Sequence, residues 1–181
     1  MKNRGITIIE MVISLSIFAV VSIIIASLYI YHSNLYRIES ADAGIKTQRA
    51  VFIKNFRETA EASSAVVATM TIGGTAYASS SSTVIFQTPS IGADKNIISN
   101  KFDYIVFYKT ANDLYMETSA DAASQRKSLK RKLSDKANAL TFRYDTTVPS
   151  SASLVTASLS LKAGELFQDT ISSSASLRNK Q

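Results

Sequence analysis

The segment Gly5-Ile6-Thr7-Ile8-Ile9-Glu10, followed by the uncharged run of residues 11–31, decides the fold of this chain. At about 1.5 Å rise per residue, a helix over this run is roughly 31 Å long, enough to cross the hydrocarbon core of a bilayer. Lys2 and Arg4 form a short basic leader before it. The sequence therefore predicts a transmembrane helix over residues 11–31.

Glu10 is the unusual residue in this segment, because a carboxylate at the membrane end of such a helix is unfavourable unless something compensates its charge. Cutting the chain after Gly5 would create a positive amine on Ile6, about 6 Å of helix rise from Glu10. In a bundle of parallel helices, Glu10 of one subunit can pair with the Ile6 amine of its neighbour, which relieves two charges at once. The alternative is that Glu10 caps a signal-anchor helix at the headgroup level.

The spacing of Gly5, Thr7 and Glu10 against the apolar run resembles the processing site of type IV pilins and type II secretion pseudopilins. The resemblance implies that a prepilin peptidase cleaves after Gly5 and methylates the new amino terminus, Ile6, where phenylalanine is more usual. It also implies a long amino-terminal helix packed on a carboxy-terminal β-rich head. The implied partners are other pilin or pseudopilin subunits, the prepilin peptidase and the cytoplasmic membrane.

Length and composition limit the possible domain organisation and the possible kinds of site. The 181 residues allow one domain plus extensions, and the formal net charge is +6. Removal of residues 1–5 leaves 18 basic against 14 acidic residues, a net charge of +4. The chain has no cysteine, which excludes disulfides and thiolate metal sites. Conventional signal-peptide cleavage has only a poor site, Ala26-Ser27 after an isoleucine run, so we expect the helix to be retained.

The helix is predicted to continue beyond the membrane. Apolar residues recur along one stripe at a period of 3.6 residues. They are Leu35, Ile38, Ala41, Ile45, Phe52, Ile53, Phe56 and Ala60. Asp42 and Arg49 interrupt the stripe; they either reach past its edge to water or pair between subunits. We therefore expect residues 1–5 to be a leader, residues 6–62 one helix, and residues 63–181 a head.

After residue 63 the hydrophobic period changes to two, which indicates strands. Those expected lie at 66–72, 75–78, 83–88, 102–109, 114–118, 128–133, 140–144 and 154–161. Gly73-Gly74 predicts a hairpin turn, and Pro89 is expected to end the third strand. Residues 102–109 are apolar on both faces and belong in the middle of a sheet. The prediction is an α+β fold with an antiparallel sheet, on which Phe52, Ile53 and Phe56 of the helix are buried.

A basic run is the most polarised surface feature of the predicted head. It comprises Arg126, Lys127, Lys130, Arg131 and Lys132. One interpretation is an edge strand whose charges stay solvated and prevent aggregation. The other is an electrostatic surface for DNA or another polyanion, as in pili that take up DNA, although no aromatic residues interleave for base stacking.

Motifs of enzymes and metal sites are absent from the sequence. His32, the only histidine, stands at the membrane-exit end of the helix without a nucleophile nearby. Five acidic residues offer oxygen ligands for calcium, but their spacing fits no defined loop. They are Asp94, Asp103, Asp113, Glu117 and Asp121. We therefore expect neither catalysis nor a resident metal or cofactor.

The sequence thus predicts a filament subunit with its head outside the cytoplasm. The order of the segments resembles the larger minor pilins and minor pseudopilins, the J-type subunits. Ser27 occupies a position where many major pilins have a helix-melting proline, which also favours a minor subunit. The alternatives are a signal-anchored binding domain that never polymerises, a DNA-uptake pilus subunit, and a secreted enzyme whose site the sequence conceals.

Overall fold

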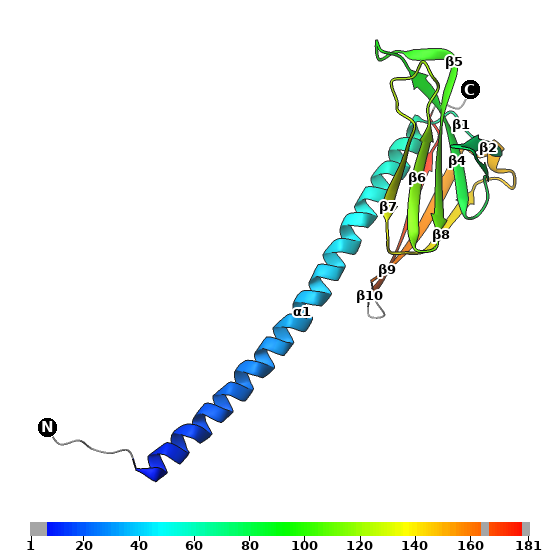
Figure 1. The fold of residues 1–181 in the computed structure, drawn as a ribbon. Coiled ribbons are helices and arrows are strands. Elements are labelled where there is room, and N and C mark those ends of the chain that lie inside the picture. Colours follow the sequence, from blue (N-terminus) through cyan, green and yellow to red (C-terminus); the bar gives the residue numbers. More distant parts are fainter. Residues whose placement is uncertain (1–6, 164–166, 179–181) are drawn as a thin grey trace. The chain divides into compact units, whose positions relative to one another are not determined.

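The structure, a computed structural model of the chain, describes residues 7–163 and 167–178. It contains one α-helix of 55 residues, α1 (Ile8–Ala62), followed by ten strands and a short 3-10 helix, η1 (Pro149–Ser151). The chain forms two compact units, residues 1–41 and 42–181, and α1 contributes to both. The predicted α+β fold, with a long amino-terminal helix before an antiparallel β-rich head, is confirmed (Figure 1).

The strands of the second unit form three antiparallel sheets. In chain order they are β1 (Ala65–Val66), β2 (Thr69–Ile72), β3 (Thr75–Ala78), β4 (Thr83–Ile91), β5 (Ile97–Thr110), β6 (Asp113–Ser119), β7 (Leu129–Ser134), β8 (Ala137–Tyr144), β9 (Leu154–Ala163) and β10 (Phe167–Ser176). The largest sheet has the order β1-β4-β5-β6-β7, the second has β10-β9-β8, and the third is the β2–β3 hairpin.

β5 lies at the centre of the five-stranded sheet, as its apolar residues on both faces predict. Ile105 and Phe107 point to one side and join the main core. Val106 and Tyr108 point to the other side, where they form a smaller cluster with Ile72 of β2. The β2–β3 hairpin therefore covers part of the outer face of the sheet, while the other face is covered by α1.

The part of α1 that belongs to the second unit packs on the two larger sheets through its apolar stripe. Phe52 and Phe56 are fully buried, and Ile53 is partly buried against the same core. Phe56 is the centre of an aromatic cluster, with ring-centroid distances of 5.8 to 6.2 Å to its neighbours. These neighbours are Phe52 of α1, Phe86 of β4, Phe107 of β5 and Phe142 of β8. One helical side chain thus joins both sheets.

The hairpin turn at Gly73-Gly74 is confirmed. Both glycines have positive φ, 56° and 82°, as a two-residue turn of type I′ requires. The single strand predicted over residues 66–72 is wrong in one respect, because the chain leaves β1 after Val66 and starts β2 only at Thr69. Val66 therefore joins the main core, whereas Ile72 joins the smaller cluster on the opposite face.

The predicted end of a strand at Pro89 is also wrong. β4 continues through Pro89 to Ile91, with a register shift between these two residues in its pairing to β5. β1 pairs only with Gln87 and Phe86, so β4 is an edge strand at Pro89, where a missing N–H is tolerated. The segment 90–100, predicted as a loop, is reduced to a turn at residues 92–96.

Candidate processing and assembly site

The described chain begins with a capping box at the start of α1. The backbone N–H of Thr7 donates to Oε2 of Glu10 at 2.9 Å, and the backbone N–H of Glu10 donates to Oγ1 of Thr7 at 3.2 Å. The Thr7 hydroxyl also donates to the same carboxylate oxygen at 3.1 Å. Because these bonds satisfy donors that the first helical turn leaves unpaired, Thr7 fixes both the helix start and the orientation of Glu10.

The capping box of Thr7 and Glu10 was not predicted from the sequence, although the sequence contains the pattern of one. Thr7 and Glu10 are three residues apart and directly precede an apolar run, which is the pattern of a capping box. Gly5 and Ile6, the predicted processing site, lie outside the described residues.

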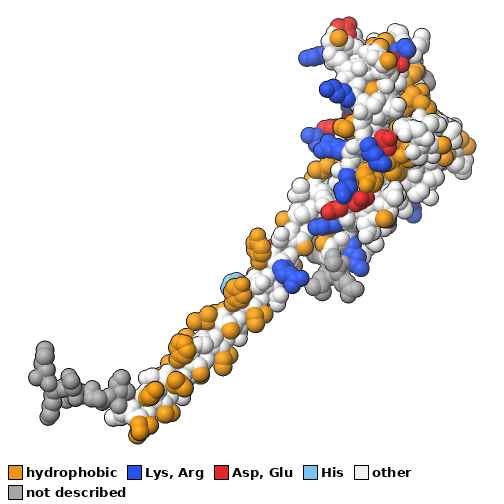
Figure 2. All heavy atoms as spheres, viewed as in Figure 1, with side chains coloured by type: hydrophobic (Ala, Val, Ile, Leu, Met, Phe, Trp, Pro, Cys, Tyr) orange, Lys and Arg blue, Asp and Glu red, His pale blue; other side chains and the backbone are white. Residues whose placement is uncertain are grey.

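Between Glu10 and Arg37 the helix carries no aspartate, glutamate, lysine or arginine. It is long and apolar enough to cross a membrane, and the most apolar stretch buries none of its side chains within the molecule. Ser16 and Ser27 donate their hydroxyls to the carbonyls of Val12 and Ile23, each at 2.8 Å. Their polar groups are therefore satisfied without water, as a lipid environment requires. Figure 2 shows the hydrophobic side chains along this segment.

Aromatic residues gather at the far end of the apolar run. Tyr29, Tyr31 and Tyr36 are all exposed, and the ring of His32 contacts that of Tyr31 edge to face at 5.9 Å. Arg37, the first charged residue after the run, follows immediately. Tyrosines followed by a basic residue are typical of the membrane–water interface. This pattern indicates that the apolar environment ends near Arg37.

Asp42 and Arg49, predicted to reach water or to pair between subunits, both have partners in their own chain. Asp42 accepts from Lys46 one helical turn later, at 2.6 Å. Arg49 donates to the carboxylate of Asp169 on β10 at 2.9 Å. Any pairing with another subunit would have to displace or share these bonds.

The structure divides the predicted basic patch. Arg126 turns inward and donates from Nη1 to Asp103 at 2.8 Å and to the carbonyl of Pro89 at 2.7 Å. Lys130 lies over the ring of Tyr115, with Nζ 4.7 Å from the centroid, and Lys132 pairs with Asp113 at 3.4 Å. Only some of the charges of the patch are therefore available to a partner.

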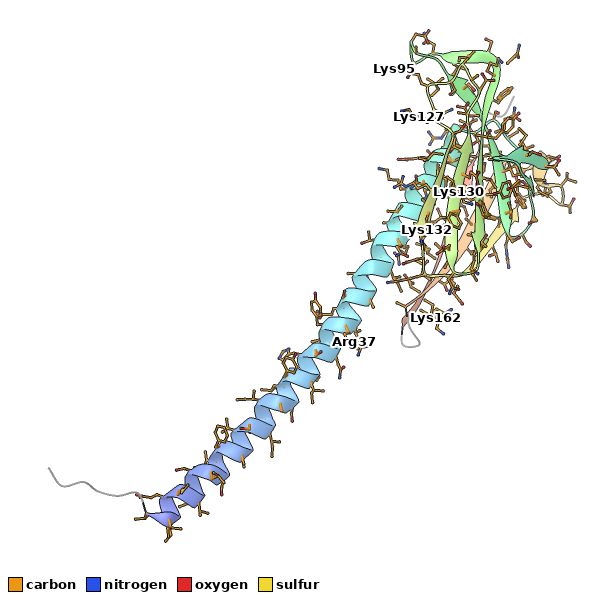
Figure 3. The ribbon with its side chains drawn as sticks, in the orientation of Figure 1. Arg37, Lys95, Lys127, Lys130, Lys132 and Lys162 are labelled. Carbon is orange, nitrogen blue, oxygen red and sulfur yellow. The ribbon has the colours of Figure 1, made fainter. Side chains whose placement is uncertain are left out.

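The remaining members of the patch lie apart. Lys127 is exposed in the loop before β7, and Figure 3 shows it with Lys130 and Lys132 on the β7 side of the head. Arg131 alternates with Lys130 and Lys132 along β7 and so points to the opposite face, the face on which Leu133 is buried. The strand alternation thus separates charges that the sequence places side by side.

The acidic residues considered as calcium ligands are held by separate partners. Asp94 accepts from the backbone and side chain of Asn96, and Asp121 accepts from Lys101 and from the N–H of Ala123. Glu117 accepts from Tyr77 and Tyr108, Asp113 from Tyr115 and Lys132, and Asp103 from Arg126. Within residues 7–163 and 167–178, no three histidine or acidic side chains are grouped to hold a metal ion.

Comparisons with known proteins agree with this geometry at the amino terminus. No curated protein and no solved structure matches the chain. Residues 1–26 match a family described as Prokaryotic N-terminal methylation motif. The match ends inside the apolar run, so it includes Glu10 and its capping partner Thr7. It marks residues 1–26 as the signal of a type IV pilin-like prepilin, the kind of signal that prepilin peptidase processes.

Proposed function

We propose that this chain is a minor subunit of a type IV pilus or type II secretion pseudopilus, of the J type. The observation that carries the proposal is the methylation motif of residues 1–26, which continues without a break into α1. Prepilin peptidase cleaves after Gly5 and methylates Ile6. The leader is residues 1–5, the helix residues 6–62 with the membrane span at 11–31, and the head residues 63–181. The head lies outside the cytoplasm, because the basic leader favours the cytoplasmic side.

The charge of Glu10 directs assembly in this proposal. Its carboxylate is exposed, and Thr7 supplies all of its hydrogen bonds within the described chain. These bonds leave the negative charge itself unneutralised. In lipid, the new amine on Ile6 of a neighbouring subunit is the group that neutralises it, and this pairing fixes the axial offset between the two helices. The helix is then drawn from the bilayer into a filament.

The minor-subunit assignment is supported by the helix and by the head. α1 continues through Ser27, which binds the carbonyl of Ile23 instead of interrupting the helix as a proline would. The head follows α1 with a five-stranded sheet and then a separate three-stranded sheet. The segments on which the resemblance to the larger minor subunits rests form β5, β6, β7 and β8 in this order.

The experiment is processing of the full chain by a co-expressed prepilin peptidase. We expect mass spectrometry to show loss of residues 1–5 and one added methyl group on Ile6. Gly5→Leu is the matched control and should block cleavage while leaving the helix in the membrane. An unprocessed wild-type chain in the presence of an active peptidase would overturn the proposal and leave a signal-anchored head.

Entry into filaments is scored separately. Glu10→Gln keeps the size of the side chain and most of its hydrogen bonds but removes the charge. We expect this variant to be cleaved normally and to enter filaments at least tenfold less than wild type. Normal entry of Glu10→Gln would contradict the role of the charge. Cleavage of wild type without entry into any filament would identify an anchored domain that does not polymerise.

A further inference from the structure

The head leaves one face of α1 open in the second unit. The two larger sheets cover the side of the helix that carries Phe52 and Phe56. Residues on the other side recur at intervals of three or four, so they follow one face of the helix. The exposed residues between positions 42 and 62 are Ala43, Lys46, Thr47, Ala50, Lys54, Arg57 and Glu58. The side chain of Glu61, one turn later, is 42% exposed.

The upper part of this open face carries charges whose sign changes along the helix. We call Lys54, Arg57, Glu58 and Glu61 the charge band. The two basic residues come first, and each acidic residue follows one of them by four positions. Their ion pairs within the chain are loose, at 4.0 Å between Lys54 and Glu58 and 3.6 Å between Glu61 and Arg178. These charges are therefore open to a second chain.

The part of the open face just before the charge band has small side chains. They belong to Ala43, Thr47 and Ala50, and all three residues are exposed. The hydroxyl of Thr47 donates to the carbonyl of Ala43 at 2.9 Å, so it needs no partner in a second chain. Small side chains let another helix approach to about 8 Å, the short end of the usual range between helix axes. A helix can therefore lie closely against this segment and reach the charge band with its next turns.

The charges that meet between two parallel copies of α1 depend on the axial offset of the helices. With no offset, each charge faces its own counterpart. An offset of three residues brings Lys54 against Arg57 and Glu58 against Glu61, so like charges still meet. An offset of four brings Glu58 against Lys54 and Glu61 against Arg57, and an offset of seven leaves one unlike pair. The charge band therefore favours an offset of four residues, about 6 Å along the axis.

We propose that the open face of α1 binds α1 of a second copy, parallel to the first and displaced by four residues. The two helices run in the same direction, so both copies are held in one membrane with their heads on the same side. Glu58 and Glu61 of one copy meet Lys54 and Arg57 of the next. This contact is head-to-tail and repeats along a filament instead of closing into a pair.

The inference rests on the proposed function, because a filament supplies parallel helices with an axial offset. Ile6 and Glu10 are also four residues apart. A Glu10 that pairs with the new amine of a neighbouring Ile6 therefore requires the same displacement as the charge band. Asp42 and Arg49 are not needed for this contact, since both are bonded within their own chain.

The charges act mainly on register in this contact. Pairs between exposed side chains add little affinity, because water screens them and long side chains lose freedom. Like charges brought together oppose a wrong offset, and complementary charges fix the right one. The second copy thus recognises a pattern of charge along the helix, which a helix with an unrelated charge order does not match.

Cysteine crosslinking tests the offset in the full chain, which has no cysteine of its own. The displacement places Thr47 of one copy level with Ala43 of the next. We expect co-expressed Thr47→Cys and Ala43→Cys chains, carrying tags of different size, to form a mixed disulfide dimer in intact cells that also express prepilin peptidase and the filament machinery. It should exceed the dimer of either variant alone about tenfold, because identical positions are about 6 Å apart along the axis. Equal dimers of the single variants would indicate helices without an offset and overturn the proposal.

The charge band is tested through the direction of the contact. In the mixed dimer, Glu58 of the Thr47→Cys chain meets Lys54 of the Ala43→Cys chain. We expect Lys54→Glu in the Ala43→Cys chain to lower the mixed dimer about threefold or more, because two acidic residues then meet. The same substitution in the Thr47→Cys chain is the matched control and should leave the dimer unchanged, since that lysine is outside this contact. Glu58→Lys in the Thr47→Cys chain should restore the dimer with the Lys54→Glu partner.

The matched control also separates a lost contact from a misfolded head, because misfolding would lower the dimer equally from either chain. Equal losses from both chains, or a failed restoration, would overturn the proposal. Processing after Gly5 is scored on the same samples by mass spectrometry. Processed chains that enter filaments without forming the mixed dimer would overturn this inference alone. An unprocessed chain would overturn the proposed function, whether or not the mixed dimer forms.

Discussion

Replacement of Asp103 by asparagine tests the buried ion pair that fixes the loop between β6 and β7. The side chain of Asp103 has 0% exposure and accepts four hydrogen bonds at 2.7 to 2.9 Å. The donors are the hydroxyls of Ser90 and Ser124, the N–H of Asp121 and Nη1 of Arg126. Asparagine keeps the size but directs an NH₂ group at two of these donors, and it leaves the guanidinium without a counter-charge.

The magnitude follows from the burial of the pair. Removing one partner of a buried ion pair typically costs about 3–5 kcal/mol, because the other charge is left uncompensated. The side chain of Arg126 retains 27% exposure, so water recovers part of this loss and the lower end of the range applies. We expect the free energy of unfolding to fall by about 3 kcal/mol. For a unit of this size, that corresponds to a decrease of roughly 6–12 °C in the thermal midpoint.

The effect of pH has a defined sign. Burial raises the pKa of Asp103, but the hydrogen bonds from Arg126, Asp121, Ser90 and Ser124 outweigh it and hold the pKa below its ordinary value of 3.8. A depressed folded-state pKa contributes stability above the unfolded-state pKa, and this stability is lost as the pH falls through the folded-state value. The difference between wild type and Asp103→Asn should therefore be constant above about pH 5 and shrink below about pH 4.

The assay is thermal unfolding of the full chain in detergent micelles, followed by near-ultraviolet circular dichroism of the tyrosines. Glu58→Gln is the matched control, since it removes a carboxylate from an exposed pair with Lys54 at 4.0 Å and should change stability by less than about 1 kcal/mol. Hydrogen exchange should show lost protection at residues 120–128. A loss in Asp103→Asn no larger than in Glu58→Gln, or one that is unchanged at low pH, would refute the reasoning.

Three further predictions concern other parts of the chain. Phe56→Ala should reduce the free energy of unfolding by about 3–5 kcal/mol in urea titrations, because it empties the centre of the aromatic cluster; the exposed Ala50→Gly change on the same helix should cost only about 1 kcal/mol. Gly73→Ala should destabilise more than Gly74→Ala in thermal unfolding: both have positive φ, but a Cβ on Gly73 lies 2.6 Å from Oε1 of Glu117, whereas one on Gly74 meets nothing within 4 Å. Thr7→Val should speed amide exchange at residues 8–10, because it removes the cap of the helix. Thr47→Val, a change within the helix, should leave exchange at residues 8–10 as in wild type. The same exchange rates at residues 8–10 in the two variants would contradict the capping role of Thr7.

Much of the fold could be predicted from local hydrophobic patterns in the sequence. The stripe through Phe52 and Phe56 and the double-faced apolar run at Phe107 are periodic, so the packing of α1 and the central place of β5 were predictable. The division of the head into separate sheets was not, because it depends on which strands pair, and several pairings satisfy the same alternation. The extension of β4 through Pro89 depends likewise on the shortness of β1, which leaves an open edge there.

Polar contacts likewise could be predicted where the partners are close in the sequence, but not where they are far apart. Thr7 and Glu10 are three residues apart, and a search for the capping pattern would have found their bonds. Arg126 and Asp103 are 23 residues apart, and nothing in the sequence connects them. Arg126 was therefore assigned to a solvated basic patch, whereas the fold uses it inside the head.

The two units of the chain differ in how the apolar side chains of α1 are covered. In the second unit, the apolar stripe of α1 that contains Ile45, Phe52 and Phe56 is covered by the sheets of the same chain. In the first unit, every described side chain of residues 7–40 is exposed, including a long succession of isoleucines, leucines and valines. An apolar surface of this extent is not stable in water, so lipid or other helices must cover it. Whatever covers it must also accommodate Glu10, and lipid alone does so at a high cost. In the proposed filament, a neighbouring helix that brings a positive charge would satisfy both demands.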